Sequence, residues 1–333
     1  MIREISIVLV SWQDEEDALE AIASYAAARG RVPAGGVAVS LVVVDNAGGR
    51  LPADAVAARW GTTGAAVLVN AENRGFGPAA NQAAAQATGD VLFFVNPDTR
   101  ADGEPFTPLA RAFAEDPRVV AAAPRLVEIE GAAPAAGAVT LAPPGREDQA
   151  TFQLRRLPTL AADASELLMV DHAFPNHRGR RRRRYADEDR GRSFEVEQPA
   201  AAALAVRRDA FVRAGGFDER YVPAWHEDVE LCRRLGEHGI ILYVPEATIR
   251  HRGGRSASRL GYDRFLPAFY RNALLYRRDH YAPADRAAYR ALLVGGMLMR
   301  LALLPLRRDV PRSRTDAARA YVRVLGLALG VST

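Results

Sequence analysis

The chain has 333 residues, of which 49% are hydrophobic and 25% are charged, a balance typical of folded proteins and one that excludes global disorder. A single cysteine, Cys232, excludes an internal disulfide and a cysteine-built metal site, which favours a reducing compartment. The basic residues are all arginine, and the net charge of +4 with a pI near 9.4 fits an anionic substrate or a membrane surface as well as nucleic acid.

The first half of the chain alternates between short apolar segments and helical segments. Repeated βα units of this kind predict a parallel sheet with right-handed crossovers. Asp45 follows the second strand directly and is followed by a flexible turn with Gly48 and Gly49. The expected strands are 4–11, 39–44, 65–69, 91–95 and 119–123, and the expected helices are 14–30, 52–60, 78–88 and 105–115.

A glycine-rich turn at residues 70–78 follows the third strand. Pro78 is expected to begin the next helix and Gly89 to close it. The glycines allow backbone to approach a ligand, and the free N–H groups of a helix start suit an anion. The turn lacks the G-x-G-x-x-G spacing of dinucleotide-binding folds.

The fourth strand, residues 91–95, ends in Asn96-Pro97-Asp98. Proline cannot extend a strand ladder, so the turn presents a carboxylate at the carboxyl end of a buried strand. Open α/β sheets bind their ligands at that end. The alternative is that Asp98 only caps the turn.

Residues 131–195 are rich in Ala, Pro, Gly and Arg and show little periodicity. They predict a long, partly mobile insertion, and such loops are usually functional or disordered. The run Arg180 to Arg184 is either a solvated surface or a contact for phosphate or anionic lipid headgroups.

A strand is expected over 195–206, followed by a short helix through Phe211 and an aromatic, glycine-rich loop that ends at Trp225. The helix after this loop carries Glu227 and Asp228 in its first turn, where the dipole favours ionised carboxylates. This position suits a structural cap and a general base equally. Glu230 and Arg234 are spaced as an i,i+4 ion pair.

A further strand is expected over 240–244, stopped by Pro245, and His251 beyond it is either structural or a ligand. Three helices are expected from about residue 260. Residues 291–306 are nearly all apolar but shorter than the roughly 20 residues that span a bilayer, which leaves an interfacial helix followed by arginines or a buried one. The N-terminus lacks a signal peptide, so a cytoplasmic location is expected.

Together these motifs resemble the inverting family 2 glycosyltransferases of the GT-A fold, of the rhamnosyltransferase-like kind. The resemblance covers roughly residues 4–256 and implies an α/β fold: a Rossmann-like, mostly parallel sheet flanked by helices, with a C-terminal helical extension. The motifs in chain order are Val10-Ser11, Val43 to Asn46, Asn73 to Gly77 with Asn81, Asn96 to Asp98, Gly215 to Glu219, Glu227 to Arg234, and His251-x-x-Gly254-x-Ser256.

The resemblance implies a role for each matching position. Asp228 is implied as the catalytic base, and Asp98 with His251 as ligands of a divalent metal, Mg²⁺ or Mn²⁺. Asn96 stands where the family has the first acid of its metal motif, so a weaker, amide-assisted site is expected and strict metal dependence stays open. The implied substrate-binding residues are Ser11, Asp45 (at the base), Asn73, Arg74, Gly75, Phe76, Asn81, Asn96, Trp225 and Glu227.

The resemblance also implies a division of labour along the chain. Residues 1–125 are expected to bind a nucleotide sugar, and residues 126–258, which include the basic insertion 131–195, are expected to bind the acceptor and catalyse transfer. Residues 259–333 are expected to form a helical segment that meets the membrane. The implied reaction moves a sugar, expected to be rhamnose, from a nucleoside diphosphate to a glycan or polyprenyl-linked acceptor.

Such a reaction belongs to cell wall or polysaccharide biosynthesis at the inner face of the plasma membrane and involves no nucleic acid. Two alternatives remain. A sugar nucleotidyltransferase uses a similar sheet but carries a basic, glycine-rich loop after its first strand, where this chain has the acidic segment 14–17. An inactive glycosyltransferase-like protein would recruit partners at the membrane.

Overall fold

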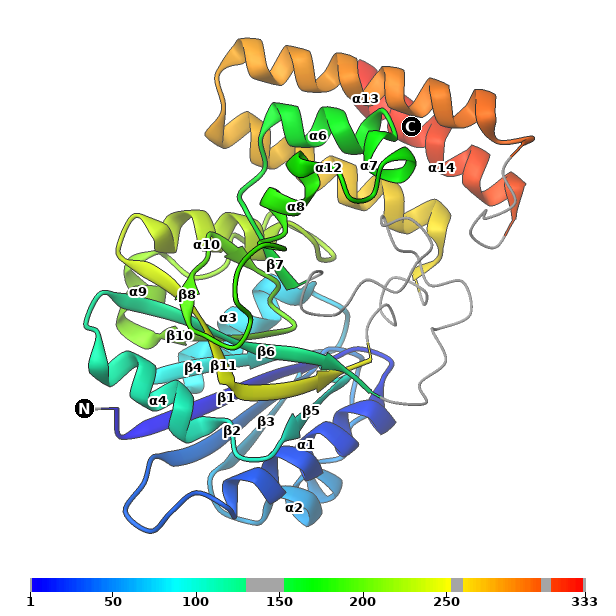
Figure 1. Cartoon of the computed structure of the whole chain (residues 1–333). Coiled ribbons are helices and arrows are strands. Elements are labelled where there is room, and N and C mark those ends of the chain that lie inside the picture. Colours follow the sequence, from blue (N-terminus) through cyan, green and yellow to red (C-terminus); the bar gives the residue numbers. More distant parts are fainter. Residues whose placement is uncertain (1, 130–152, 253–259, 307–312, 332–333) are drawn as a thin grey trace. The chain divides into compact units, whose positions relative to one another are not determined.

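The computed structural model describes residues 2–129, 153–252, 260–306 and 313–331 (Figure 1). The chain divides into two compact units, which we call the sheet unit and the helical unit. The sheet unit contains residues 1–130, 148–155 and 188–252, and the helical unit contains residues 131–147, 156–187 and 253–333. Residues 125 and 126, between which the sequence predicts the end of the donor-binding half, therefore lie in the same unit.

The sheet unit is built on one mixed sheet, which has nine strands within the described residues. Its order is β3-β2-β1-β4-β10-β6-β11-β5, with β8 paired to β11. The strands β3, β2, β1 and β4 are parallel, and β10 runs antiparallel between β4 and β6. The bounds are β1 (Glu4–Ser11), β2 (Ala38–Asp45), β3 (Ala65–Val69), β4 (Val91–Val95), β5 (Thr99–Asp102), β6 (Val119–Glu128), β8 (Phe194–Glu195), β10 (Ala203–Arg207) and β11 (Ile240–His251).

Helices flank this sheet and bury its apolar side chains (Figure 1). Every side chain of β4 is buried, as expected for a strand covered on both faces. Tyr25 of the first helix is fully buried, and its hydroxyl lies 2.9 Å from the Thr99 hydroxyl. The helices are α1 (Glu15–Arg29), α2 (Ala53–Trp60), α3 (Phe76–Gln86), α4 (Phe106–Glu115), α9 (Arg208–Arg213) and α10 (Glu227–Gly236), and β7 (Leu154–Arg155) pairs with β9 (Gln198–Pro199) apart from the main sheet.

The expected strands and helices of the first half are confirmed, with three differences: β5 was not expected, β6 runs beyond residue 123 to Glu128, and α3 begins at Phe76 rather than at Pro78. Proline fits there because the first N–H groups of a helix have no intrahelical acceptor. Gly89 does not end the helix, which stops at Gln86. A Cβ on Gly89 would lie 2.6 Å from the backbone nitrogen of Ser6, so this glycine permits close approach to β1 instead.

The predicted end of the last strand at Pro245 is wrong, because β11 runs on to His251. A register shift against β6 between Val244 and Thr248 absorbs the proline, as bulges do. The predicted continuous strand 195–206 is also wrong, since it breaks into β8, β9 and β10. The extension of β11 places His251 opposite Thr99 of β5.

The helical unit contains six helices within the described residues. The prediction of three C-terminal helices is confirmed, but residues 160–183 form three further helices where little regular structure was expected. Residues 131–152 of the expected insertion lie outside the described residues. Arg300 donates to the carbonyl oxygens of Glu166 and Leu167, a contact that the local sequence does not reveal. The helices are α6 (Leu160–Leu167), α7 (Val170–Ala173), α8 (Arg178–Arg183), α12 (Tyr262–His280), α13 (Pro283–Leu303) and α14 (Arg314–Leu329).

The arginine run and the apolar helix both have partners inside this unit. In α8, Arg181 binds Asp187 and Arg183 binds Asp171. The helix α13 packs against α6 and α14, and its buried side chains include Leu293 and Met297. Of the helices that the structure describes, none is long and apolar enough to cross a membrane. Three of the arginines that follow the apolar segment in the sequence, Arg307, Arg308 and Arg312, lie outside the described residues.

We predict that Gly239→Ala destabilises the sheet unit, because the new Cβ would lie 2.2 Å from the Arg118 carbonyl oxygen and 2.6 Å from Val120 Cγ1. Overpacking of this kind costs about 1–3 kcal/mol, which thermal or urea denaturation would detect. Gly236→Ala is the matched control: a Cβ there meets nothing within 4 Å, so the variant should be as stable as the parent or slightly more so. Equal stability of the two variants would contradict the prediction.

Candidate active site

The candidate site lies at the carboxyl ends of β1, β2 and β4. Because these strands are parallel neighbours, residues that follow them meet at one edge of the sheet. Ser11 and Asp45 are register partners at this edge, and the backbone N–H of Asn46 donates to the Ser11 carbonyl oxygen at 2.8 Å. The Ser11 hydroxyl is buried and donates to Asp14 Oδ1 at 2.6 Å.

Asp45 closes the loop that follows β2. Its buried carboxylate accepts from the Ala47 amide at 2.9 Å and from the Leu51 amide at 2.8 Å. A carboxylate offers about four acceptor positions, so a ligand can still bind to it. The loop and its carboxylate are therefore fixed relative to β2.

An asparagine cluster orders the glycine-rich turn after β3. Asn46 Nδ2 donates to Asn73 Oδ1 at 2.9 Å and to the Gly75 carbonyl oxygen at 3.2 Å. Asn46 Oδ1 accepts from Asn70 Nδ2 at 3.0 Å and from the Arg74 amide at 3.2 Å. Neither Asn46 nor Asn70 is among the site residues predicted from the sequence. Each directly follows one of two neighbouring strands, β2 and β3, and this position is the signal that could have identified them.

The turn packs against the loop that precedes α10. The Phe76 amide donates to the Pro223 carbonyl oxygen at 2.8 Å, and the rings of Phe76 and Phe217 lie 5.5 Å apart, edge to face. Gly75 has a φ of +92°, and a Cβ on it would lie 2.9 Å from Val222 Cγ1. Only glycine meets both conditions at this position.

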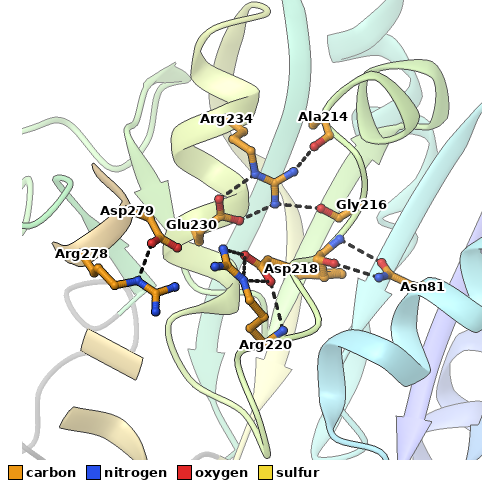
Figure 2. A network of polar contacts seen from close by, with 10 residues as sticks. Asn81, Ala214, Gly216, Asp218, Arg220, Glu230, Arg234, Arg278 and Asp279 are labelled. Carbon is orange, nitrogen blue, oxygen red and sulfur yellow. Dashed lines mark hydrogen bonds and ion pairs between the residues drawn. The ribbon is translucent and has the colours of Figure 1, made fainter. Parts of the chain in front are cut away.

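Asn81 joins α3 to the same loop, as Figure 2 shows. Its Oδ1 accepts from the Phe217 amide, and its Nδ2 donates to the Phe217 carbonyl oxygen, both at 2.8 Å. Gly216 has a φ of +71°, and a Cβ on it would lie 2.7 Å from Asn81 Oδ1. Because the side-chain amide of Asn81 is hydrogen-bonded to the backbone of Phe217, the geometry gives Asn81 a positioning role.

The predicted ion pair of α10 is confirmed and does more than support the helix. Arg234 Nε donates to Glu230 Oε1 at 2.7 Å, and its Nη2 donates to the Gly216 carbonyl oxygen at 2.8 Å (Figure 2). Its Nη1 binds the Ala214 carbonyl oxygen. Arg234 thereby fixes α10 to the loop that Asn81 holds from the other side.

Two residues with positive φ lead into α10, Trp225 at +76° and His226 at +70°. Non-glycine residues in this region are uncommon and are often found at functional sites. Glu227 follows and is buried, and its Oε2 has no hydrogen-bond partner within the described part of the chain. Burial, together with the neighbouring charge of Asp228, raises the pKa of Glu227 well above its usual range.

Asp228 lies against the backbone that enters β10. Its Oδ2 accepts from the Ala201 amide at 3.3 Å and lies 3.5 Å from Gln198 Nε2. The next carbonyl oxygen, that of Ala202, accepts from the Asn96 amide at 2.9 Å. Two consecutive backbone residues therefore connect Asp228 to the end of β4. Burial raises the pKa of Asp228, which opposes the effect expected of the helix dipole.

Asp98 and His251 face each other, with 3.4 Å between Asp98 Oδ1 and His251 Nε2, and both are buried. Burial opposes ionisation of Asp98, but the attraction of His251 and the more distant Arg100 outweighs it and lowers the pKa of Asp98. The Arg252 amide donates to the Asp98 carbonyl oxygen at 3.0 Å, which holds the two strand ends together.

This pair supplies one oxygen and one nitrogen donor, which suits a transition-metal ion such as Mn²⁺. Among the described residues, no group of three His, Cys, Asp or Glu side chains could hold a metal. A metal here would therefore take its remaining ligands from substrate and water. The sequence-predicted residues with exposed side chains are Asn73 and Arg74.

Solved structures of glycosyltransferases share this fold. The mannosyltransferase PcManGT of Pyrobaculum calidifontis, in complex with GDP-Man and Mn²⁺, is 14% identical with a TM-score of 0.54, and the match covers 98% of this chain and 86% of that one. GalNAc-T7 with UDP, GalNAc and Mn²⁺ is 16% identical with a TM-score of 0.53, and the match covers 86% of this chain and 51% of that one. The fold is the GT-A fold of glycosyltransferases, as expected.

Comparison of the sequence with known families indicates which glycosyltransferases this chain is similar to. Residues 6–159 match the family Glycosyl transferase family 2. Over 116 residues the chain is 36% identical to the N-acetylglucosaminyl-diphospho-decaprenol L-rhamnosyltransferase of Mycobacterium tuberculosis, a match that covers 34% of this chain and 37% of that protein. The match thus spans little more than a third of the relative. Residues 6–159 are therefore similar to family 2 glycosyltransferases, and a part of the chain is similar to a rhamnosyltransferase.

We predict that Asn46→Asp loosens the turn at residues 73–75, because a carboxylate cannot donate to Asn73 Oδ1 or to the Gly75 carbonyl oxygen. Leaving buried acceptors without donors costs about 1–3 kcal/mol of unfolding free energy, measurable by urea denaturation. Asn176→Asp makes the same charge change at an exposed position and should leave stability unchanged. A stable Asn46→Asp protein would show that the cluster does not hold the turn.

Proposed function

We propose that the chain is an inverting glycosyltransferase that moves a sugar from a nucleoside diphosphate to a hydroxyl group of the acceptor, with Asp228 as the base. One observation carries this proposal: the Asp228 carboxylate accepts from the backbone N–H of Ala201, and the carbonyl oxygen of the next residue, Ala202, accepts from the backbone N–H of Asn96 at the end of β4. The Asp228 carboxylate therefore belongs to the edge of the sheet at which Asp98 and His251 meet. The match to family 2 supports the reaction class.

The environment of Asp228 suits a base. Its pKa is raised by burial, and a carboxylate with a raised pKa takes a proton from a hydroxyl group more readily once it is ionised. The Ala201 and Val229 amides, at 3.3 and 2.8 Å, fix its two oxygens. The acceptor hydroxyl, deprotonated by Asp228, attacks the anomeric carbon opposite the leaving diphosphate, which inverts that centre.

The donor is bound, in this proposal, by the carboxyl ends of β1 and β2 and by the turn at residues 73–76. Asp45 binds the nucleobase of the donor, and the exposed Arg74 guanidinium binds its diphosphate. Asp98 and His251 hold a divalent cation, which when bound stabilises the charge that develops on the leaving diphosphate. The structural neighbours, in complexes with GDP-Man or UDP and Mn²⁺, support a nucleotide-sugar donor and such a metal.

The sugar and acceptor follow from the curated relative, whose name specifies L-rhamnose and a lipid-linked diphosphate acceptor. We propose rhamnose as the sugar and a polyprenyl-linked glycan as the acceptor, in cell wall or polysaccharide biosynthesis. Residues 1–125 then serve the donor, residues 126–258 serve the acceptor and supply Trp225 and Glu227 as further sugar contacts, and residues 259–333 meet the membrane surface.

We predict that Asp228→Asn lowers turnover by about 10²–10⁴-fold, the usual contribution of a positioned base, while donor affinity stays within a few fold. Release of nucleoside diphosphate from a panel of nucleotide sugars measures turnover, and calorimetry measures donor binding. Asp54→Asn is the matched control, since Asp54 also lies in a first helical turn and accepts from the next amide, at 2.9 Å. Unchanged turnover with lost donor binding would refute Asp228 as the base.

We predict that turnover rises with pH through the acidic range and then levels off. The raised pKa of Asp228 means that its carboxylate, the form that accepts a proton, appears only above the usual range for aspartate. A pH profile of turnover at saturating donor and acceptor measures this, with circular dichroism to confirm that the fold persists at each pH. A rate that falls as pH rises across this range would contradict a carboxylate base.

A further inference from the structure

The helical unit contains a cavity of about 350 Å³ lined by residues of α12 and α13. These helices pack against each other along the hairpin that joins them (Figure 1). Among the described residues that line it, four are arginines, Arg277, Arg278, Arg286 and Arg290, and none is acidic. The volume is within the range of sites for small ligands, about 300–1,000 Å³.

Arg277 is the buried member of this set, with 2% of its surface exposed. Its guanidinium stacks between two rings, 4.4 Å from the centroid of Tyr281 and 4.5 Å from that of Tyr289, and its Nη2 binds Asp163. Its Nη1 has no hydrogen-bond partner among the described residues. A buried N–H group without an acceptor is costly, so an acceptor supplied by a ligand would stabilise the unit.

The remaining arginines leave the cavity with excess positive charge. Arg278 Nε binds Asp279 at 2.9 Å, a pair also drawn in Figure 2. Arg286 Nη1 donates to the Arg278 carbonyl oxygen at 3.2 Å, and Arg290 Nη1 donates to that of Ala328 at 2.9 Å. Within the described part of the chain, neither Arg286 nor Arg290 pairs with a carboxylate.

Two further features favour an anion. Pro283 lines the cavity and is the first residue of α13, a helix whose N-cap residue, Ala282, makes no side-chain cap, so the positive end of the helix dipole lies at the cavity. Burial raises the pKa of Asp163 to about 7 despite the nearby Arg277. At neutral pH this carboxyl group is only partly ionised and offsets the charge of Arg277 incompletely.

We infer that this cavity binds a phosphate or diphosphate group, and we name its arginines the arginine pocket. Several guanidinium groups around one cavity match the several negatively charged oxygens of a phosphate, which accept bidentate hydrogen bonds. The group arrives either on a lipid headgroup or as free phosphate. The inference rests on the helical unit alone and holds whether or not the sheet unit transfers sugars.

The test compares Arg286→Gln with Arg264→Gln in the full chain. Both remove one positive charge from the helical unit; Arg264 is an exposed residue of α12 outside the arginine pocket. Calorimetric titration with inorganic pyrophosphate should show a site whose dissociation constant rises about tenfold or more in Arg286→Gln, the loss expected for one charged hydrogen bond. Arg264→Gln should bind as the parent does, and Arg286→Lys should lose less than the glutamine variant.

A second arm uses vesicles of phosphatidylcholine with and without phosphatidic acid, followed by flotation. If phosphatidic acid vesicles bind the parent chain but not Arg286→Gln, and pyrophosphate does not bind, the source is a lipid headgroup and the inference stands. Pyrophosphate binding that Arg286→Gln weakens identifies a free or detachable diphosphate. Equal binding by the two glutamine variants in both arms, or no binding by the parent in either, overturns the inference. Circular dichroism confirms that each variant is folded.

Discussion

The position of β10 is the constraint on which the candidate site depends. This strand runs antiparallel between β4 and β6, so it begins where β4 ends. The residues just before it, Ala201 and Ala202, therefore lie at the carboxyl edge of the sheet, where one binds Asp228 and the other binds Asn96. An antiparallel strand in this place brings a carboxylate from a distant helix to the edge at which parallel strands present their ligands.

Close backbone approach is the second condition. Gly75 and Gly216 both have positive φ, and each lies where a Cβ would meet a neighbouring side chain within 3 Å. Their absence of side chains lets the turn after β3, the loop before α10 and Asn81 interlock. Three segments that are far apart in the sequence therefore pack closely, because these glycines leave room for the neighbouring side chains.

Two arginines, one in each unit, differ in how their guanidinium groups are bonded. Half-buried Arg234 has a carboxylate and two carbonyl oxygens around its guanidinium, and these hydrogen bonds fix α10. Buried Arg277 stacks between two aromatic rings and binds one carboxylate, but one of its nitrogens has no acceptor among the described residues. A saturated guanidinium supports structure, whereas an unsaturated one beside a cavity retains the capacity to bind an anion.

The sequence by itself determined what depends on local pattern: the buried strand β4, the βα order of the first half, the ion pair between Glu230 and Arg234, and the motifs that mark family 2. Tertiary structure alone decided the passage of β11 through Pro245, the contact of Asp228 with the backbone before β10, and the helices formed within residues 160–183. It also decided the raised pKa of Asp228, because burial and not the helix dipole governs that group. These features rest on contacts between segments many residues apart, which neither periodicity nor turn chemistry encodes.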